Sequence, residues 1–225
     1  METVDTQKAG IDYKFEAHHY VWYNRYSTNG KDAPKDIDPA ACQKEESSRR
    51  NNTCQNNPRT SGEKQGNLPI LVQVKKAFDD VFEWIAKTLK KVLPKEYEII
   101  SQFADILPAG AISTVYPFSG FVVNFNVTTR IHQNMHNKIL CVVLVISDDG
   151  CKGGDLCLLE PRIRLQMKSS DVIIFLSTKL SHFNMHYKGQ RASFVFQTDA
   201  QGDQWVVDRD GWQESRSMNA TDKNM

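Results

Sequence analysis

Long apolar stretches, paired cysteine motifs and an excess of charge are all missing from this sequence. No apolar run approaches the roughly 20 residues that a membrane-spanning helix needs, so we expect no membrane span. Five cysteines are present, none in a C-x-x-C pair, and at least one thiol must stay unpaired; they are Cys42, Cys54, Cys141, Cys151 and Cys157. A reduced, intracellular protein is the simplest interpretation of this cysteine usage.

The charges nearly balance. Lys and Arg number 28 and Asp and Glu number 27, for a net charge of +1. Bulk electrostatics therefore give no general attraction to nucleic acid or to an anionic membrane, although a local basic patch stays open. The opening residues, METVDTQKAGIDYK, contain no apolar segment of the kind that a secretory signal requires. We expect an intracellular protein, either cytoplasmic or nuclear. Nucleic acid stays among the possible partners, but the net charge does not indicate it.

The 225 residues are 40% apolar, which is enough for one domain with a real core. Residues 1–26 are rich in aromatics and carry His18 and His19, for which surface packing is the simpler interpretation and metal ligation the alternative. Residues 27–67 are poor in apolar side chains, so we predict a flexible loop there. We expect helical support over 68–110, a strand-rich region over 111–212 and a disordered tail over 213–225.

A helix is predicted over residues 68–93, because apolar residues recur there at three- and four-residue steps. These residues are Val74, Phe78, Val81, Ile85, Leu89 and Val92. Pro94 should end that helix, and residues 95–107 favour a second, shorter one that ends at Pro108.

Short strands dominate the rest of the chain. They are predicted at 121–129, 139–146, 155–159, 163–167, 172–176, 182–187, 192–198 and 205–207, with Gly, Asp, Ser and Lys turns between them. Many short strands at regular spacing indicate a sandwich, a barrel or a jelly roll. The sequence therefore predicts an α+β domain in which N-terminal helices pack against a β-rich half.

A small set of polar residues in this half points to chemistry. His132 and His182 lie at predicted strand ends, and Arg191 with Ser193 follows on the next strand. Mononuclear iron oxygenases bind their metal through two histidines and one carboxylate, leaving positions open for cosubstrate and O₂. An arginine fork beside a serine hydroxyl suits the distal carboxylate of a 2-oxo acid. Because a buried arginine needs an anionic partner, we expect Arg191 to meet either such an acid or a structural carboxylate.

Five motifs follow one another in an order that resembles the Fe(II)/2-oxoglutarate dioxygenase superfamily. They are HQN at His132–Asn134, GGDLCLLE at Gly153–Glu160, SSDVIIF at Ser169–Phe175, SHFN at Ser181–Asn184 and GQRAS at Gly189–Ser193. Superfamily patterns run H-x-D, G-G-x-L, G-D-x-x-x-F, H and R-x-S at similar spacing. The stretch from Tyr116 to Trp212 is most similar to stand-alone fungal domains of this superfamily. More remotely it resembles TET/JBP-type nucleobase oxygenases and prolyl-hydroxylase-like enzymes.

The resemblance implies a double-stranded β-helix (jelly roll) that binds Fe(II) and 2-oxoglutarate and uses O₂ to hydroxylate a C–H bond. It implies His132, Asn134 and His182 as metal ligands and catalytic residues. Arg191, Ser193 and Asn124 would bind the cosubstrate. The substrate stays open between a nucleobase, a protein side chain and a small metabolite.

Two positions depart from the superfamily pattern. Asn134 stands where the metal-binding aspartate is usual, and an amide ligates iron more weakly than a carboxylate. Ser170 replaces the usual turn glycine. His136 is an alternative nearby ligand. The departure at Asn134 keeps a second hypothesis open, a catalytically decayed domain acting as a binding module, and a cupin-like metal protein is a third.

Overall fold

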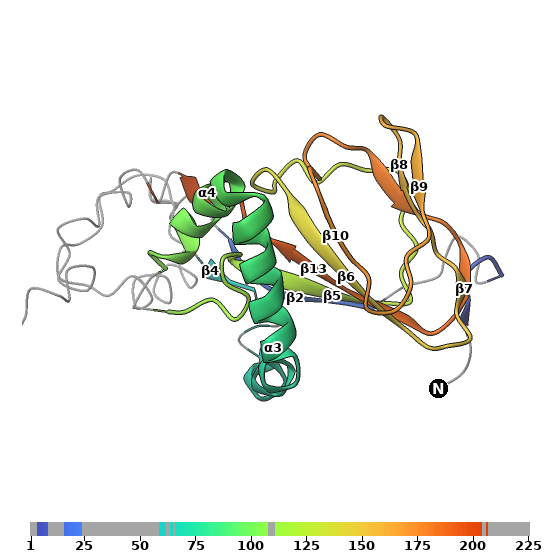
Figure 1. Cartoon of the computed structure of the whole chain (residues 1–225). Coiled ribbons are helices and arrows are strands. Elements are labelled where there is room, and N and C mark those ends of the chain that lie inside the picture. Colours follow the sequence, from blue (N-terminus) through green and yellow to red (C-terminus); the bar gives the residue numbers. More distant parts are fainter. Residues whose placement is uncertain are drawn as a thin grey trace, which may run out of the picture.

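The computed structural model describes residues 4–8, 16–23, 59–61, 64, 66–107, 111–203 and 206. Two long helices and several antiparallel sheets make up this part of the chain, which confirms the predicted α+β class (Figure 1). Among the described residues, no helix combines the length and apolar character needed to cross a bilayer.

The two helices are α3 (Leu68–Val92) and α4 (Pro94–Ala104), close to their predicted bounds. Helix α3 buries one apolar stripe that includes Phe82, Ile85 and Leu89. The assignment of Val92 to this stripe is wrong, because its side chain is 61% exposed. A four-residue step from Leu89 reaches Leu93 instead, which packs on the core. Pro94 ends α3 as predicted and also begins α4, where a missing N–H costs little.

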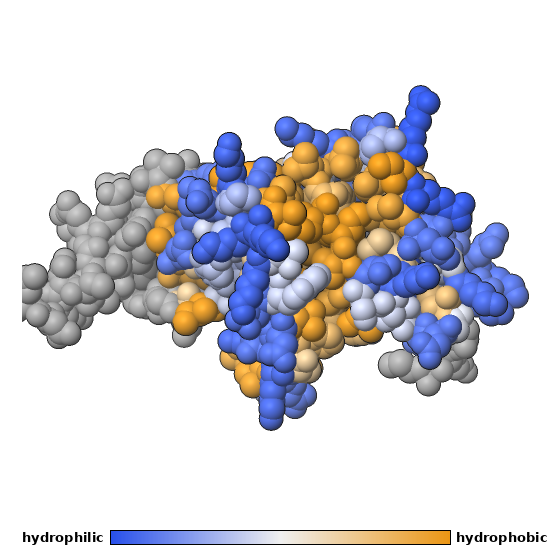
Figure 2. All heavy atoms as spheres, in the orientation of Figure 1, coloured by the Kyte–Doolittle hydropathy of each residue, from blue (hydrophilic) through white to orange (hydrophobic). Residues whose placement is uncertain are grey.

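The main sheet has five antiparallel strands in the order β10-β6-β13-β5-β2. Their bounds are Val172–Phe175, Cys141–Ser147, Arg191–Gln197, Gly120–Phe125 and Glu16–Tyr20. Strand β13, the last of the five in the chain, lies at the centre and pairs with β6 on one side and β5 on the other. Figure 2 shows apolar side chains gathered over the region of the edge strand β10.

An aromatic cluster joins α3 to one face of this sheet. The Phe82 ring lies with its centroid 6.0 Å from that of Phe121, 6.0 Å from Phe194 and 5.4 Å from Phe196. All four side chains are at most 4% exposed. Because Phe194 and Phe196 alternate with Ser193 and Val195, successive side chains of β13 face opposite sides of the sheet. The helices cover one side, and the other side is left for the candidate site.

Short strands flank that second side. Strands β11 (His182–Asn184), β8 (Leu156–Leu158) and β9 (Ile163–Leu165) form one small sheet. Strands β1 (Val4–Asp5), β12 (Tyr187–Gly189) and β7 (Lys152–Gly153) form another. Strand β3 (Trp22–Tyr23) pairs with β4 (Arg59–Thr60).

The N-terminal half contains more sheet structure than the sequence predicts. Strand β2 completes the main sheet, and Tyr20 in it is only 4% exposed, so this side chain belongs to the core, whereas the rest of the strand is exposed or half-buried. Residues 59–61, predicted as loop, include β4 and the buried Ser61. Most of the predicted loop and the whole predicted tail lie outside the described residues.

Three predicted strands differ in the second half of the chain. The strand predicted over 182–187 is divided, because β11 ends at Asn184 and β12, in another sheet, begins at Tyr187. The strand predicted over 121–129 ends at Phe125, because Asn126 has a left-handed φ of 54°. Of the strand predicted over 205–207 the structure describes only Val206, which is helical.

Candidate active site

A cavity of about 880 Å³ lies against the face of the main sheet opposite α3. Its lining includes all six residues that the sequence singled out, namely Asn124, His132, Asn134, His182, Arg191 and Ser193. These residues come from β5, from the segment between β5 and β6, and from strands β11 and β13. The structure therefore brings together side chains that are up to 69 positions apart (193 − 124).

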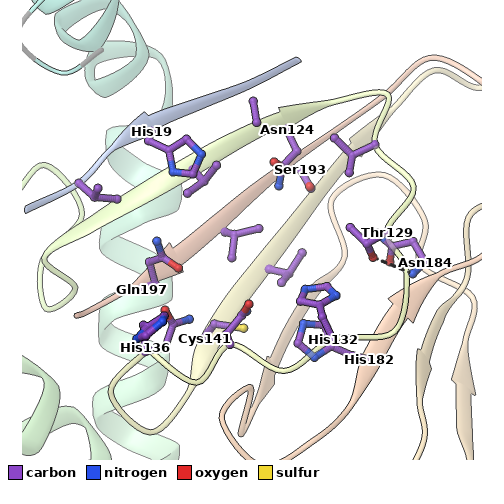
Figure 3. Close-up of a pocket in the computed structure, with 18 of the residues that line it drawn as sticks. His19, Asn124, Thr129, His132, His136, Cys141, His182, Asn184, Ser193 and Gln197 are labelled. Carbon is purple, nitrogen blue, oxygen red and sulfur yellow. Dashed lines mark hydrogen bonds between the residues drawn. The ribbon is translucent and has the colours of Figure 1, made fainter. Parts of the chain in front are cut away.

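Strand β13 supplies one wall through its alternating side chains. Arg191, Ser193, Val195 and Gln197 line the cavity. At about 3.3 Å per residue, these four positions extend along the cavity for roughly 20 Å. Ser193 pairs directly with Asn124 of β5, and Figure 3 shows the two side chains side by side. The predicted grouping of a serine hydroxyl, an asparagine amide and an arginine on one wall is present.

The two histidines meet at a second wall. His132 and His182 form an isolated antiparallel bridge, with N–H to carbonyl distances of 3.1 Å and 2.9 Å. Their ring centroids are 4.3 Å apart, and Figure 3 shows the rings adjacent to each other. His182 is 6% exposed and contacts the Phe175 ring, whereas His132 is exposed.

Backbone contacts fix the tautomer of both rings. Nδ1 of His132 lies 2.8 Å from the Arg130 carbonyl, and Nδ1 of His182 lies 2.9 Å from the Leu180 carbonyl. A carbonyl oxygen only accepts hydrogen bonds, so Nδ1 carries the proton in each ring. Nε2 then holds a lone pair when the ring is neutral, which is the arrangement of a metal-ligating histidine.

Burial lowers the pKa of His182, and the neighbouring His132 lowers it further, against the opposing effect of the hydrogen bond to Leu180. The neutral form that can bind a metal is thereby favoured at neutral pH.

A carboxylate is missing beside this histidine pair. Within the ranges that the structure describes, no group of three His, Cys, Asp or Glu side chains could hold a metal ion. Asn134 lines the cavity two residues beyond His132, and its N–H donates to the Ser177 carbonyl at 2.9 Å. His136 also lines the cavity, but Figure 3 places its ring away from the His132–His182 pair. The side chains that line this part of the cavity are therefore two imidazoles and a neutral amide.

Arg191 is the buried cation of the cavity. Its side chain is 9% exposed, Nη1 donates to the Gly154 carbonyl at 2.6 Å, and the guanidinium lies 5.8 Å from the centre of the Tyr187 ring. No carboxylate among the described residues forms an ion pair with it. Burial lowers the pKa of Arg191, but a guanidinium stays charged in proteins. The charge of the buried Asp155 favours the charged form of Arg191, but the Asp155 carboxylate forms its ion pair with Arg164. Among the described residues, no carboxylate lies within ion-pair distance of Arg191.

Gly154 allows this arginine to pack closely. A Cβ added to Gly154 would lie 2.1 Å from Nη1 of Arg191, and the residue has a φ of +76° that favours glycine. The Asn126 side-chain oxygen accepts the Arg191 backbone N–H at 3.0 Å. The G-G pair and Asn126 thus position the arginine from opposite sides.

The cavity lining also includes His19, which the sequence analysis named with metal ligation as the alternative to surface packing, and Cys141 and Gln197, to which it gave no role. Figure 3 shows His19 and Gln197 toward the end of the cavity away from the histidine pair. Cys141 is fully buried, and burial raises its pKa to about 12. Strand alternation along EAHHY would have separated the cavity-facing His19 from the outward-facing His18 if this segment had been predicted as a strand.

No protein-family model and no curated protein sequence matches the chain. Solved structures do. NgTET1 in complex with 5mC DNA matches with a TM-score of 0.56 and 10% identity over 88% of this chain, which spans 66% of NgTET1, just under two thirds of its length. A Pseudomonas putida prolyl-4-hydroxylase matches with a TM-score of 0.30 and 18% identity over 37% of this chain and 54% of that enzyme.

A 2OG-Fe(II) oxygenase family protein from Burkholderia pseudomallei matches with a TM-score of 0.29 and 14% identity over 36% of this chain and 43% of that protein. Of these three structures, NgTET1 is the one similar enough to support an argument, and at 10% identity the similarity concerns the fold alone. The described part of the chain therefore shares its α+β fold with NgTET1.

Proposed function

We propose that this protein is an Fe(II)- and 2-oxoglutarate-dependent dioxygenase with a double-stranded β-helix core, which hydroxylates a C–H bond of a substrate still to be identified. The observation that carries the proposal is Arg191. A guanidinium that is 9% exposed and has no carboxylate partner in the described chain calls for an anionic ligand. It lies in the same cavity as two histidines whose Nε2 atoms are available to a metal.

Each end of a 2-oxo dicarboxylic acid has a suitable partner in this cavity. The distal carboxylate would accept hydrogen bonds from the Arg191 fork and the Ser193 hydroxyl, with the Asn124 amide beside them. His132, His182 and the amide oxygen of Asn134 would hold the iron. When bound, iron and 2-oxoglutarate together supply the oxidation of a C–H bond by O₂, with succinate and CO₂ as the other products.

The remaining cavity would receive the substrate. Gln197, His19 and His136 lie there, and Arg191 is the only Lys or Arg in the lining that the structure describes. A substrate that enters without an anionic group suits such a lining, because nothing in it would pair a second buried negative charge. NgTET1 was solved with 5mC DNA, which keeps a nucleobase among the candidates beside a protein side chain and a small metabolite.

The rival function is a binding module that has lost turnover. The specific observation in its favour is the neutral Asn134 near two histidines, since no group of three His, Cys, Asp or Glu side chains among the described residues could hold a metal ion. A dication held by neutral ligands alone has less charge compensation than one held by a carboxylate, so affinity falls. Such a protein would still bind 2-oxoglutarate or a related acid at Arg191.

An anaerobic titration with Fe(II) and 2-oxoglutarate tests the proposal. Formation of the ternary complex gives a visible charge-transfer band, which neither component gives alone. On exposure to O₂ the complex should release succinate in an iron-dependent manner. A band without succinate would support the binding module, and failure to bind 2-oxoglutarate with or without metal would refute both.

A further inference from the structure

The inference concerns what holds the two histidines in place, and it rests on their proposed role as metal ligands. Each ring is hydrogen-bonded only to a carbonyl two residues before it in its own segment, Arg130 for His132 and Leu180 for His182. Those contacts orient each ring within its segment. They do not fix the distance between the segments, on which a shared metal site depends.

Few hydrogen bonds join the two segments directly. Strand β5 ends at Phe125, and the residues around His132 reach β11 through an isolated bridge with one N–H to carbonyl bond in each direction. His132 itself is exposed. One further bond, from the Asn184 N–H to the Thr129 hydroxyl at 3.3 Å, joins β11 to the segment before His132. These three hydrogen bonds are few contacts with which to hold two segments at a fixed separation.

We propose that Glu160 is a positioning residue that clamps the His132 and His182 segments together from outside the cavity. It lies in the turn between β8 and β9, two residues beyond Leu158, which pairs with His182. Its carboxylate reaches the immediate chain neighbour of each histidine, Gln133 on one segment and Ser181 on the other.

The contacts of this carboxylate are specific. Oε2 accepts the Ser181 backbone N–H at 2.7 Å, and Oε1 accepts the Ser181 hydroxyl at 2.6 Å. Nε2 of Gln133 lies 3.5 Å from Oε1, 3.1 Å from the Ser181 hydroxyl oxygen and 3.3 Å from the Lys179 carbonyl. One ionised group thereby organises a three-residue network across both segments, and hydrogen bonds to an ionised acceptor are stronger than neutral ones.

Two further facts fit this role. The Leu159 N–H donates to the Ser181 carbonyl at 2.9 Å, so the turn that carries Glu160 is itself bound to the start of β11. The hydrogen bond from Ser181 holds the pKa of Glu160 below its usual value, which keeps the carboxylate ionised near neutral pH. The Glu160 carboxylate therefore restrains the two proposed ligands, His132 and His182, through their chain neighbours and not through contact with either ring.

The test compares Glu160→Ala and Glu160→Gln with a matched control, Asp149→Asn, which removes an exposed turn carboxylate outside this network. The first measurement uses the metal-free protein and follows amide hydrogen exchange at His132 and His182. We expect exchange at both amides to accelerate by about tenfold in Glu160→Ala, with an unchanged thermal midpoint. Glu160→Gln keeps the size and one acceptor oxygen, so it should fall between Ala and the parent. The control should match the parent.

The second measurement titrates Co(II), whose ligand-field spectrum reports the geometry of the site. Loss of an outer-layer partner typically weakens metal binding by about 10–100-fold, and we expect Glu160→Ala to fall in that range with an altered spectrum. Unchanged exchange at His132 and His182 in Glu160→Ala would overturn the clamp. If exchange is faster in Glu160→Ala but the parent protein binds no metal, the clamp is supported and the proposed function is refuted. Failure of the clamp and failure of the proposed function therefore give different results.

Discussion

Replacing Arg191 with Met removes the one buried cation of the cavity while keeping a long side chain of similar reach. In the parent, the Gly154 carbonyl occupies one N–H donor of the guanidinium. An arginine has five such donors in a fixed fork, so enough remain to hold a carboxylate through two of them. Methionine offers none, and the distal carboxylate of 2-oxoglutarate would then be desolvated without a partner.

The size of the loss follows from the burial of the site. Because Arg191 is only 9% exposed, little water can reach the bound carboxylate to replace the hydrogen bonds that the arginine would give it. Removing one partner of a buried, hydrogen-bonded charge pair costs about 2–5 kcal/mol. Taking about 3 kcal/mol, at about 1.4 kcal/mol per factor of ten, the Kd for 2-oxoglutarate should rise by roughly 100-fold. Arg191→Lys keeps the charge but not the fork, so its loss should be about tenfold.

Anaerobic calorimetry with Fe(II)-loaded protein measures both variants, and Arg162→Met, at an exposed turn arginine, is the matched control. The control should bind 2-oxoglutarate as the parent does. Fe(II) binding without the acid should be equal in all four proteins, because none of the changes touches a histidine. If Arg191→Met binds 2-oxoglutarate within twofold of the parent, Arg191 is not the anchor and the assignment of the cosubstrate is wrong.

Four further outcomes are expected. Asn134→Asp should tighten anaerobic Fe(II) binding by about tenfold or more and raise succinate release; no gain in either would mean that Asn134 does not face the metal. Gly154→Ala should abolish 2-oxoglutarate binding in calorimetry, because its Cβ would lie 2.1 Å from the arginine Nη1. Phe82→Ala should destabilise the protein by about 3–5 kcal/mol in urea unfolding, since its ring contacts three buried phenylalanines. The lowered pKa of His182 makes the unfolded chain bind more protons, so stability should fall as pH drops below about 6.5, and His182→Gln should flatten that part of the curve.

Helices and central strands were predictable from local pattern. The stripe through Phe78 and Leu89 predicted α3, because burial of one helix face leaves apolar residues at three- and four-residue steps. The apolar run over 139–146 predicted β6, because a strand buried on both faces is continuously apolar. The N-terminal strand β2 was not predicted. Its residues, EAHHY, are short and mixed in polarity, and it becomes a strand through pairing with β5 about a hundred residues away.

The candidate site was predictable to the extent that its residues have few alternative roles. Arg191 on an apolar strand required an anionic partner, and its burial in the cavity agrees with that argument. The restraint by Glu160 could not be predicted, because it depends on a turn of one hairpin reaching the neighbours of two histidines. The roles of His132, Asn134 and His182 at a metal stay predictions.

The central place of β13 has a consequence for the order in which the protein can assemble. Strands β2, β5, β6 and β10 all leave the ribosome before it, yet β5 and β6 meet only through β13. Until residues 191–197 are available, the sheet consists of two separate pairs, β2 with β5 and β6 with β10. The strand that joins them is also the one that carries Arg191 and Ser193. A chain that completes its sheet therefore places Arg191 and Ser193, the proposed anchor for the cosubstrate, in the same step, and no folded intermediate with an intact sheet can lack them.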